Sequence, residues 1–316
     1  MQADFATLVR DGLWATRRSC FVLALWLAAP LTAHTAPDVP VDPALGESIV
    51  MVKNGRLLPA DLETTLFRPP GEGPFPVVLV NHGKESGNNR LQARYRPVVA
   101  ARQFLQRGWA VVVPMRQGFS NSGGRAVGEG CNIAGNGDAQ ADDIRAVVTW
   151  LATQPWADTE RMLMVGQSHG GLTTLAYARQ PHPGFKLFVN FAGGLKWADG
   201  SCDWRQTLVD AFARYGAATR VPSLWFYGAN DSYFPPEVIA PAHAAYVAAG
   251  GPAELVAYGA FGSDAHAMFN RAAGLPIWWP RVRERLDAAG LPTRVVYPEF
   301  AASAAASRPD AAGSAR

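Results

Sequence analysis

The chain has 316 residues, of which 48% are hydrophobic, and a formal net charge of only +3 at neutral pH. This length allows one large domain or two small ones, and the hydrophobic content suits a compact core. The lysines and arginines are scattered and form no block of five or six, so a nucleic-acid-binding protein is excluded.

The N-terminal residues, 1–36, have the pattern of a signal peptide. Two arginines at 17–18 precede an apolar run from Cys20 to Leu31, which has the length of the hydrophobic region of a secretory signal. A membrane-spanning helix needs about 20 apolar residues, so we expect no stable membrane anchor once the signal is removed. A Pro-rich linker at 37–47 follows. The sequence therefore predicts export to the periplasm or the cell exterior.

Two cysteines, Cys131 and Cys202, lie outside the predicted signal peptide. In an oxidising compartment an isolated pair is a candidate disulfide, although two unrelated buried thiols fit the count as well. Such a bridge would join a Gly-rich segment, 118–136, to the segment 197–214, and we expect the two to form a lid. Two cysteines this far apart do not make a zinc site, and we expect neither a metal nor a cofactor.

Short apolar runs alternate with helical patterns over residues 48–295, which we expect to form one domain. We expect strands at 48–53, 62–68, 76–81, 110–114, 161–165, 187–191, 221–227 and 254–258, and helices at 96–106, 139–153, 171–179, 238–249 and 277–288. This alternation predicts an α/β fold with a mostly parallel central sheet and helices on both faces. Asn54-Gly55 predicts the turn of an N-terminal antiparallel hairpin. Residues 296–316 have little to bury and are predicted to be a disordered tail.

Residues 166–170, Gly-Gln-Ser-His-Gly, follow a predicted buried strand and precede a predicted helix. A G-x-S-x-G pattern at such a junction is typical of a sharp turn that exposes a nucleophilic serine, here Ser168. The two glycines are required because a Cβ atom at either position would collide with neighbouring backbone. A serine that only caps the helix is the alternative interpretation, and the preceding apolar strand favours the nucleophile.

A serine nucleophile needs an imidazole to accept its proton and a carboxylate to orient that imidazole. Asp231 follows a predicted strand at the sheet edge where ligand-facing groups collect, and His266 lies on a loop after the last strand. Their order after Ser168 is the order found in proteins with this type of serine turn. Asp264 is a rival for the acid, but it lies only two residues from His266. Asp142 and Asp143 are expected instead to serve the N-terminus of helix 139–153.

The predicted strand 76–81 is followed by His82-Gly83-Lys84. In serine hydrolysis two backbone N–H groups stabilise the developing oxyanion, one from this loop and one from the residue after the nucleophile. We expect the donors to be the amide of His169 and the amide of either Gly83 or Lys84. Gly83 would let a substrate approach the backbone closely. An ordinary strand-to-helix turn is the alternative.

Several of these motifs together resemble the dienelactone-hydrolase-like branch of the α/β-hydrolases. They are Asn81-His-Gly83, Gly166-Gln-Ser-His-Gly-Gly171, Gly228-Ala-Asn-Asp231, Asp264-Ala-His266 and the loop Arg116–Gly124. The resemblance spans most of residues 50–290 and implies the α/β-hydrolase fold and the roles of nucleophile, acid and base given above. Dienelactone hydrolases carry cysteine at the position of Ser168, so lactone hydrolysis is not implied. The Gly-x-Ser-x-Gly-Gly form is also similar to prolyl-oligopeptidase-type peptidases, whose propeller domain has no room in this chain.

These observations predict a serine hydrolase, a carboxylesterase that acts on a small-molecule or polymer ester through an acyl-enzyme. A peptidase or amidase with the same three residues is the first alternative. A non-catalytic scaffold used for binding is the second, and the intact order of Ser168, Asp231 and His266 counts against it.

Overall fold

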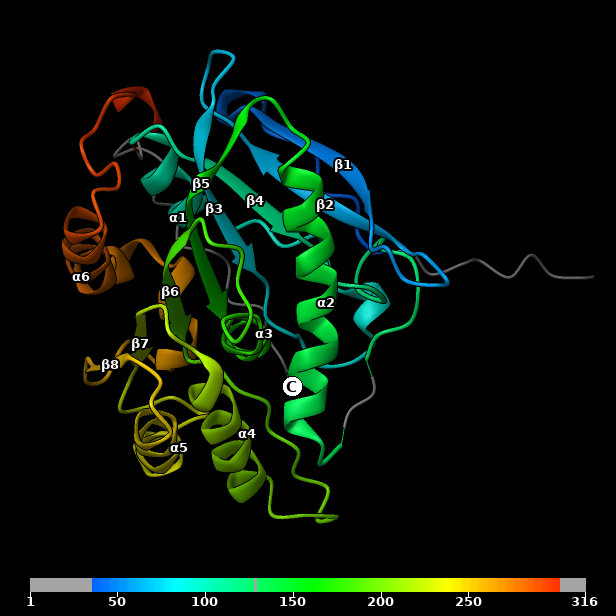
Figure 1. The fold of residues 1–316 in the computed structure, drawn as a ribbon, viewed down its shortest axis with the longest axis vertical. Helices are drawn as coiled ribbons and strands as arrows, with labels where there is room; N and C mark the ends of the chain where they lie inside the picture. Colours follow the sequence, from blue (N-terminus) through cyan, green and yellow to red (C-terminus); the bar gives the residue numbers. More distant parts are fainter. Residues whose placement is uncertain (1–35, 128–129, 302–316) are drawn as a thin grey trace, which may run out of the picture. The chain divides into compact units, whose positions relative to one another are not determined.

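The computed structural model describes residues 36–127 and 130–301 (Figure 1). Most of the predicted signal peptide and the tail from residue 302 lie outside the described residues. The packed chain extends beyond the predicted domain end at residue 295, because Tyr297 and Phe300 contact the hydrophobic core. No helix of the described ranges has the length and hydropathy needed to span a bilayer.

Eight described strands form one sheet in the order β1-β2-β4-β3-β5-β6-β7-β8 (Figure 1). They are β1 (Glu47–Lys53), β2 (Asp61–Phe67), β3 (Phe75–Asn81), β4 (Ala110–Pro114), β5 (Ala157–Gln167), β6 (Phe185–Phe191), β7 (Ser223–Tyr227) and β8 (Ala253–Ala257). β1 and β2 are antiparallel to each other, β2 is antiparallel to β4, and the strands from β4 to β8 are parallel. This confirms the predicted fold class, a mostly parallel sheet with an N-terminal antiparallel hairpin.

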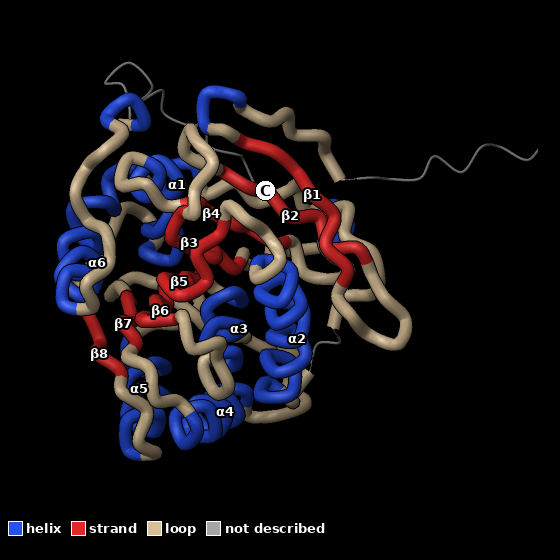
Figure 2. Tube along the Cα trace, turned by 45° about the horizontal axis from the view of Figure 1, so that its top comes forward, coloured by secondary structure: helices blue, strands red, loops and turns tan. Residues whose placement is uncertain are grey.

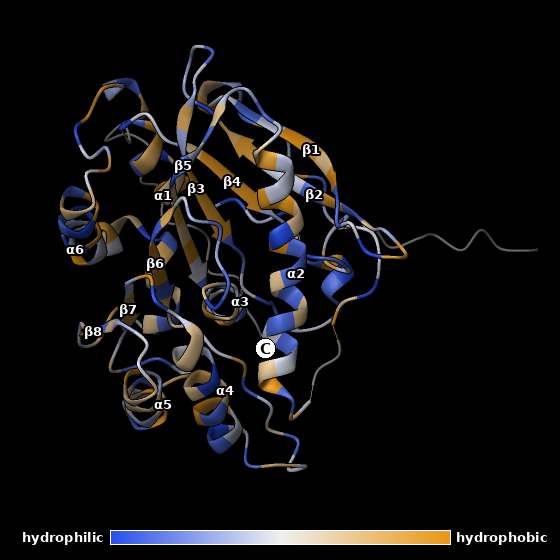
Figure 3. Ribbon diagram, viewed as in Figure 1, coloured by the Kyte–Doolittle hydropathy of each residue, from blue (hydrophilic) through white to orange (hydrophobic). Residues whose placement is uncertain are grey.

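The longer helices of the described residues are α1 (Val98–Leu105), α2 (Ile133–Leu151), α3 (His169–Tyr177), α4 (Trp204–Ala218), α5 (Pro236–Ala248) and α6 (Leu275–Ala288). α1 and α6 cover one face of the sheet, and α2, α3, α4 and α5 cover the other (Figure 2). Alternate residues of the buried strands supply the two cores, as expected for a strand with a side-chain period of two. Val77 and Leu79 of β3 belong to one core, and Val78 and Val80 belong to the other. Figure 3 shows these central strands as continuously hydrophobic, which is the pattern of a sheet covered on both faces.

The turn predicted at Asn54-Gly55 lies in the β1–β2 connection, which runs from residue 54 to residue 60, and the Asn54 side chain holds this loop by accepting a hydrogen bond from the Ala60 amide at 2.9 Å. One predicted feature of the N-terminal half is corrected by the structure. Helix α2 begins at Ile133, where the Asn132 side chain caps it. Asp142 and Asp143 therefore lie within the helix and do not serve its N-terminus.

Helix α4 occupies most of the segment 197–214 that was predicted to belong to a lid. It packs against α5 and α2, so this part of the segment is a layer of the domain and does not cover the site as a loop. Asp203 caps the helix by accepting hydrogen bonds from the amides of Arg205 and Gln206. The sequence before it, Ala-Asp-Gly-Ser-Cys, is polar and small, which masked the helix start.

Cys131 and Cys202 form a disulfide in the structure, with their Cα atoms 6.1 Å apart. The bridge joins the segment before α2 to the segment before α4, and it closes a sequence separation of 71 residues. It therefore ties together the N-terminal ends of two helices that pack against each other on the same face of the sheet.

Replacing both cysteines by serine is expected to lower the free energy of unfolding by about 2–4 kcal/mol, because the open chain regains the conformational entropy that the bridge removes from the unfolded state. Equilibrium urea unfolding of the oxidised wild type and the double variant measures this difference. The wild type in excess dithiothreitol is the control, and its urea midpoint of unfolding should equal that of the double variant. A reduced wild type as stable as the oxidised protein would contradict the expectation.

Candidate active site

Ser168 stands at the junction of β5 and α3, where the chain turns sharply from strand to helix. Its backbone has φ 56° and ψ −124°, a conformation that residues other than glycine rarely adopt. The carbonyl group of Ser168 accepts hydrogen bonds from the amides of Gly171 at 2.8 Å and Gly194 at 3.1 Å, which hold the turn from two sides. The strained turn projects the hydroxyl group away from the sheet.

Two glycines make this turn possible. A Cβ atom on Gly166 would lie 2.2 Å from the carbonyl oxygen of Gly170, and one on Gly170 would lie 2.1 Å from the carbonyl oxygen of Asn81. Real Cβ atoms essentially never approach other atoms this closely. The physical reason for the G-x-S-x-G spacing is thus the close contact of α3 with the ends of β3 and β5, which leaves no room for a side chain at either glycine.

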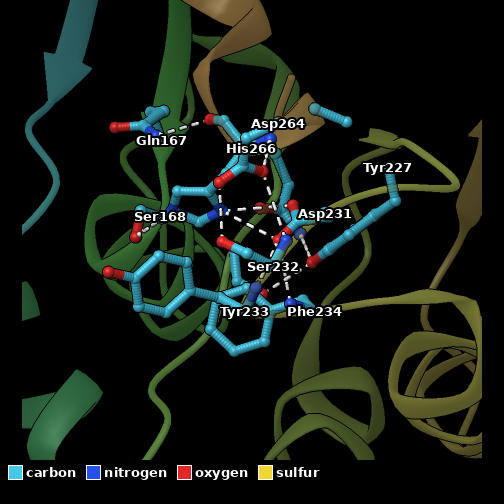
Figure 4. A network of polar contacts seen from close by, with 12 residues as sticks. Gln167, Ser168, Tyr227, Asp231, Ser232, Tyr233, Phe234, Asp264 and His266 are labelled. Atoms are coloured by element: carbon cyan, nitrogen blue, oxygen red, sulfur yellow. Dashed lines mark hydrogen bonds and ion pairs between the residues drawn. The ribbon is translucent and has the colours of Figure 1, made fainter. Parts of the chain in front are cut away.

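The structure brings together Ser168, His266 and Asp231 (Figure 4). The Nε2 atom of His266 lies 2.9 Å from the Oγ atom of Ser168, and the Nδ1 atom of His266 lies 3.1 Å from both carboxylate oxygens of Asp231. Asp231 is buried, and its Oδ1 atom also accepts hydrogen bonds from the amides of Tyr233 and Phe234, each at 2.9 Å. The carboxylate is therefore fixed in position from two directions.

The rival acid, Asp264, has different partners. Its carboxylate accepts hydrogen bonds from the hydroxyl group of Ser232 at 2.6 Å and from the backbone amide of His266 at 2.9 Å. The imidazole Nδ1 atom is turned to Asp231 instead. The geometry thus places Asp231, and not Asp264, in line with the imidazole and the serine hydroxyl.

The three residues predicted to form the oxyanion hole lie around Ser168. His169 is the first residue of α3, so its amide has no acceptor within the helix and lies at the positive end of the helix dipole. Gly83 is close enough to Ser168 that a Cβ atom on it would lie 3.3 Å from the serine Cβ. Gly83 and Lys84 line the cavity at Ser168.

The side chain of His169 points away from the reacting atoms and is buried. Its Nε2 atom lies 2.8 Å from the Oδ1 atom of Asn136 and 2.6 Å from the Nε2 atom of Gln140. Burial, followed by the charges of Arg116 and Lys84, lowers the pKa of His169 well below its ordinary value, so the ring is neutral at neutral pH. The ring of His169 is therefore held against α2 and not beside His266.

Arg116 supports the loop that carries Gly83 and was not identified as a site residue from the sequence. Its guanidinium donates a hydrogen bond to the carbonyl oxygen of His82 at 2.8 Å, and its amide donates to the Nε2 atom of His82 at 3.1 Å. Burial, with the charge of Arg116 as the second cause, lowers the pKa of His82 well below its ordinary value, so the ring can accept this bond. Burial also lowers the pKa of Arg116 itself to about 9. The sequence feature that could have identified Arg116 is its position just after a buried strand, in a motif shared with the family that the chain resembles.

A cavity with two lobes opens at Ser168. Both lobes are lined by Lys84, Glu85, Ser168 and Tyr233. The first lobe, of about 180 Å³, continues over His266 and Gln167 to Gln92 and Tyr95, and the second, of about 100 Å³, continues to Gly194, Leu195, Lys196 and Phe234. Across residues 36–127 and 130–301, no group of three or more His, Cys, Asp or Glu side chains is arranged to hold a metal ion.

The sheet order, the serine turn between β5 and α3, and the positions of Asp231 and His266 after β7 and β8 define an α/β-hydrolase. More narrowly, the chain belongs to the X-Pro dipeptidyl-peptidase (S15) family, whose model matches residues 60–222, just over half of the sequence. No curated protein is detectably similar to the chain in sequence.

Solved structures share this fold at low sequence identity. A putative dienelactone hydrolase from Klebsiella pneumoniae is 21% identical, with a TM-score of 0.53 over 76% of this chain and 98% of that one. An esterase from Pyrococcus furiosus is 18% identical, with a TM-score of 0.55 over 81% of this chain and 97% of that one. Dipeptidyl peptidase 4 from Porphyromonas gingivalis is 18% identical, with a TM-score of 0.56 over 76% of this chain but only 35% of that one. The protein is therefore similar in fold to both esterases and peptidases.

The crowding at the serine turn can be tested with Gly170→Ala. We expect this change to lower the free energy of unfolding by more than about 2 kcal/mol, because the added Cβ must displace either β3 or α3. Gly55→Ala is the matched control: Gly55 has a positive φ of 65° but open space around it, so only the backbone strain of about 1 kcal/mol should appear. Thermal and urea unfolding measure both variants, and equal losses would show that crowding does not constrain the turn.

Proposed function

We propose that this protein is a serine hydrolase that cleaves carboxylic esters through an acyl-enzyme on Ser168. The observation that carries the proposal is the continuous line of contacts from the Ser168 hydroxyl through the His266 imidazole to the buried Asp231 carboxylate, with distances of 2.9 Å and 3.1 Å. A buried carboxylate on Nδ1 fixes the imidazole tautomer whose Nε2 atom accepts the serine proton.

The chemistry follows from these positions. The Ser168 hydroxyl transfers its proton to His266 as its oxygen attacks the ester carbonyl, and Asp231 stabilises the imidazolium that forms. The amide of His169, together with that of Gly83 or Lys84, stabilises the negative oxygen of the tetrahedral intermediate. His266 then gives the proton to the leaving alcohol, and a water molecule activated by the same imidazole hydrolyses the acyl-enzyme.

The two lobes of the cavity receive the two parts of the ester. The leaving alcohol must lie beside His266 to receive its proton, so it occupies the first lobe, which His266 lines. The acyl group then occupies the second lobe, between Leu195 and Phe234. That lobe holds about 100 Å³, well below the volume of pockets for drug-sized ligands, and this favours short acyl groups.

Amide cleavage is the second candidate, and the family match is the observation that favours it. The same three residues would serve, and Glu85, which lines both lobes, offers a carboxylate for a substrate amine. The small second lobe counts against it, because a dipeptidyl group is much larger than a short acyl chain. Parallel assays on p-nitrophenyl butyrate and Ala-Pro-p-nitroanilide separate the two, and faster cleavage of the anilide would make the protein a peptidase.

We also propose that the mature protein lies outside the cytoplasm. Two observations support this: the signal-like N-terminus and the Cys131–Cys202 bridge, since disulfides persist mainly in oxidising compartments. Fractionation of cells that express the full chain, with N-terminal sequencing of the product, tests this assignment and locates any cleavage site.

Ser168→Ala is expected to reduce kcat on p-nitrophenyl esters by at least about 10³-fold and to abolish labelling by a fluorophosphonate probe, because no other group can form the acyl-enzyme. Steady-state kinetics and mass spectrometry of the labelled protein measure the two effects. Ser48→Ala, at an exposed position of β1, is the control and should keep wild-type activity. Undiminished hydrolysis by Ser168→Ala would remove the proposed function.

The size of the second lobe predicts that kcat/KM is highest for acetyl to butyryl esters and falls for octanoyl and longer chains, because the excess methylene groups cannot be buried. Leu195→Ala should enlarge the lobe and move the optimum to longer chains, with each newly buried methylene worth up to about 0.8 kcal/mol. A series of p-nitrophenyl esters from C2 to C12 measures both profiles. A wild-type optimum at C8 or above would show that the acyl group does not lie in this lobe.

A further inference from the structure

Asp231 and His266 lie on two separate loops that meet beside Ser168. Asp231 ends the turn after β7, and His266 is the second residue of a short 3₁₀ helix, η3 (Ala265–Asn270), after β8. No covalent or helical continuity fixes the distance between the carboxylate and the imidazole. Interactions between the two loops must therefore set it.

The side chain of Asp264 joins these loops at the point nearest the imidazole (Figure 4). On one side its carboxylate accepts hydrogen bonds from Ser232, the neighbour of Asp231, through the hydroxyl group at 2.6 Å and the amide at 3.2 Å. On the other side it accepts the backbone amide of His266 at 2.9 Å. The Asp264 carboxylate thus holds both Ser232, the residue after Asp231, and the backbone of His266.

These bonds stabilise the ionised form of Asp264. Partial burial alone would raise the pKa of this carboxyl, but the hydrogen bonds from Ser232 and from the His266 amide outweigh it and hold the pKa below the ordinary value. Hydrogen bonds to an ionised acceptor are about twice as strong as those between neutral groups. Asp264 is therefore ionised at neutral pH, and its hydrogen bonds to the two loops are stronger than bonds between neutral groups.

Other contacts hold the rest of the base loop in place without Asp264. The side chain of Asn230 accepts a hydrogen bond from the Phe261 amide at 2.9 Å and donates to the carbonyl oxygen of Gly262 at 3.1 Å. The hydroxyl group of Tyr258 donates to the carbonyl oxygen of Ala265 at 2.9 Å. The Gln167 side chain also donates to the His266 carbonyl oxygen at 3.1 Å. Loss of the Asp264 carboxylate should thus leave the loop folded and shift mainly the imidazole relative to Asp231.

We propose that Asp264 is a positioning residue, whose carboxylate sets the alignment of His266 with Asp231 and Ser168 by joining the acid turn to the base loop. It touches no reacting atom, and it acts through the His266 backbone and through Ser232. The inference rests on the proposed function, in which His266 accepts the serine proton. It adds a second carboxylate whose role differs from that of Asp231.

The test compares Asp264→Ala, Asp264→Asn and Ser232→Ala in the full-length protein. For Asp264→Ala we expect kcat on p-nitrophenyl acetate to fall about 10- to 100-fold with KM changed less than about threefold, because a misplaced base slows proton transfer but leaves the cavity intact. Asp264→Asn should recover part of the loss, since its amide oxygen can still accept the His266 amide. Ser232→Ala, which removes one of the three bonds, should lose less than Asp264→Ala.

Asp42→Ala is the matched control, because Asp42 also caps a short 3₁₀ helix, η1 (Pro43–Leu45), with its side chain accepting an amide at 3.0 Å, but belongs to a different part of the domain. It should keep wild-type kcat. The proposal is overturned if Asp264→Ala keeps kcat within twofold of the wild type, or if KM rises while kcat is unchanged. A fall in kcat that Asp264→Asn does not partly restore would also overturn it.

The rate of Ser168 labelling by a fluorophosphonate separates this proposal from the proposed function. The label reports on the serine and its base without any ester, so a wild type that hydrolyses no ester but reacts with the probe would remove only the ester assignment. The positioning role would then be judged by a 10-fold or greater loss of labelling rate in Asp264→Ala, and an unchanged labelling rate would refute it.

Discussion

The strained backbone of Ser168 is the constraint on which the rest of the site depends. A positive φ at a serine is unfavourable by about 1–3 kcal/mol, and the surrounding structure must compensate for it. Two amides, from Gly171 and Gly194, hold the serine carbonyl, and the contact of Gly170 with the end of β3 leaves no space for the turn to relax. The projection of the hydroxyl from the sheet is thus a consequence of packing between α3 and two buried strands.

The loop opposite the serine turn is held by a different kind of interaction. Arg116, almost fully buried, donates to the carbonyl of His82, while the neutral ring of His82 accepts the amide of Arg116. The carboxylate of Asp143, in the middle of α2, accepts the amide of Gln117 at 2.9 Å and the side chain of Asn54 at 3.2 Å. Burial of charged groups is tolerated only when they are hydrogen-bonded, so these contacts connect the loop of Gly83 rigidly to β4, α2 and the β1–β2 loop. This rigidity fixes the backbone amides of the loop, as the oxyanion role that we propose for them requires.

Asp231 and His266 are held by polar contacts between loops, and not by packing of regular elements. Asp231 is fixed by two amides of its own turn, and His266 is fixed by Asp264, by Tyr258 through Ala265, and by the side chain of Gln167, which donates to the His266 carbonyl at 3.1 Å. Gln167, the residue before Ser168, therefore also supports His266. Three loops after β5, β7 and β8 become one unit through these bonds. The ring of Tyr233, whose centroid lies 4.6 Å from that of the imidazole, lines the cavity beside His266.

The sequence by itself determined the fold class, most strands and helices, and the residues that the structure brings together at Ser168. Continuous apolar strands alternating with amphipathic helices allow few architectures, and the G-x-S-x-G spacing has a local steric cause that can be read without coordinates. Helix α4 and the early start of α2 were not predicted, although Asp203 and Asn132 cap these helices through contacts only two or three residues away in the sequence. The sequence already favoured Asp231 over Asp264 and already offered Cys131 and Cys202 as a candidate bridge. Only the tertiary structure decided that Arg116 supports the loop of Gly83 and that Asp264 joins the turn of Asp231 to the loop of His266. Those choices depend on how loops from distant strands meet at one edge of the sheet, and a linear pattern carries no information on distances across that edge.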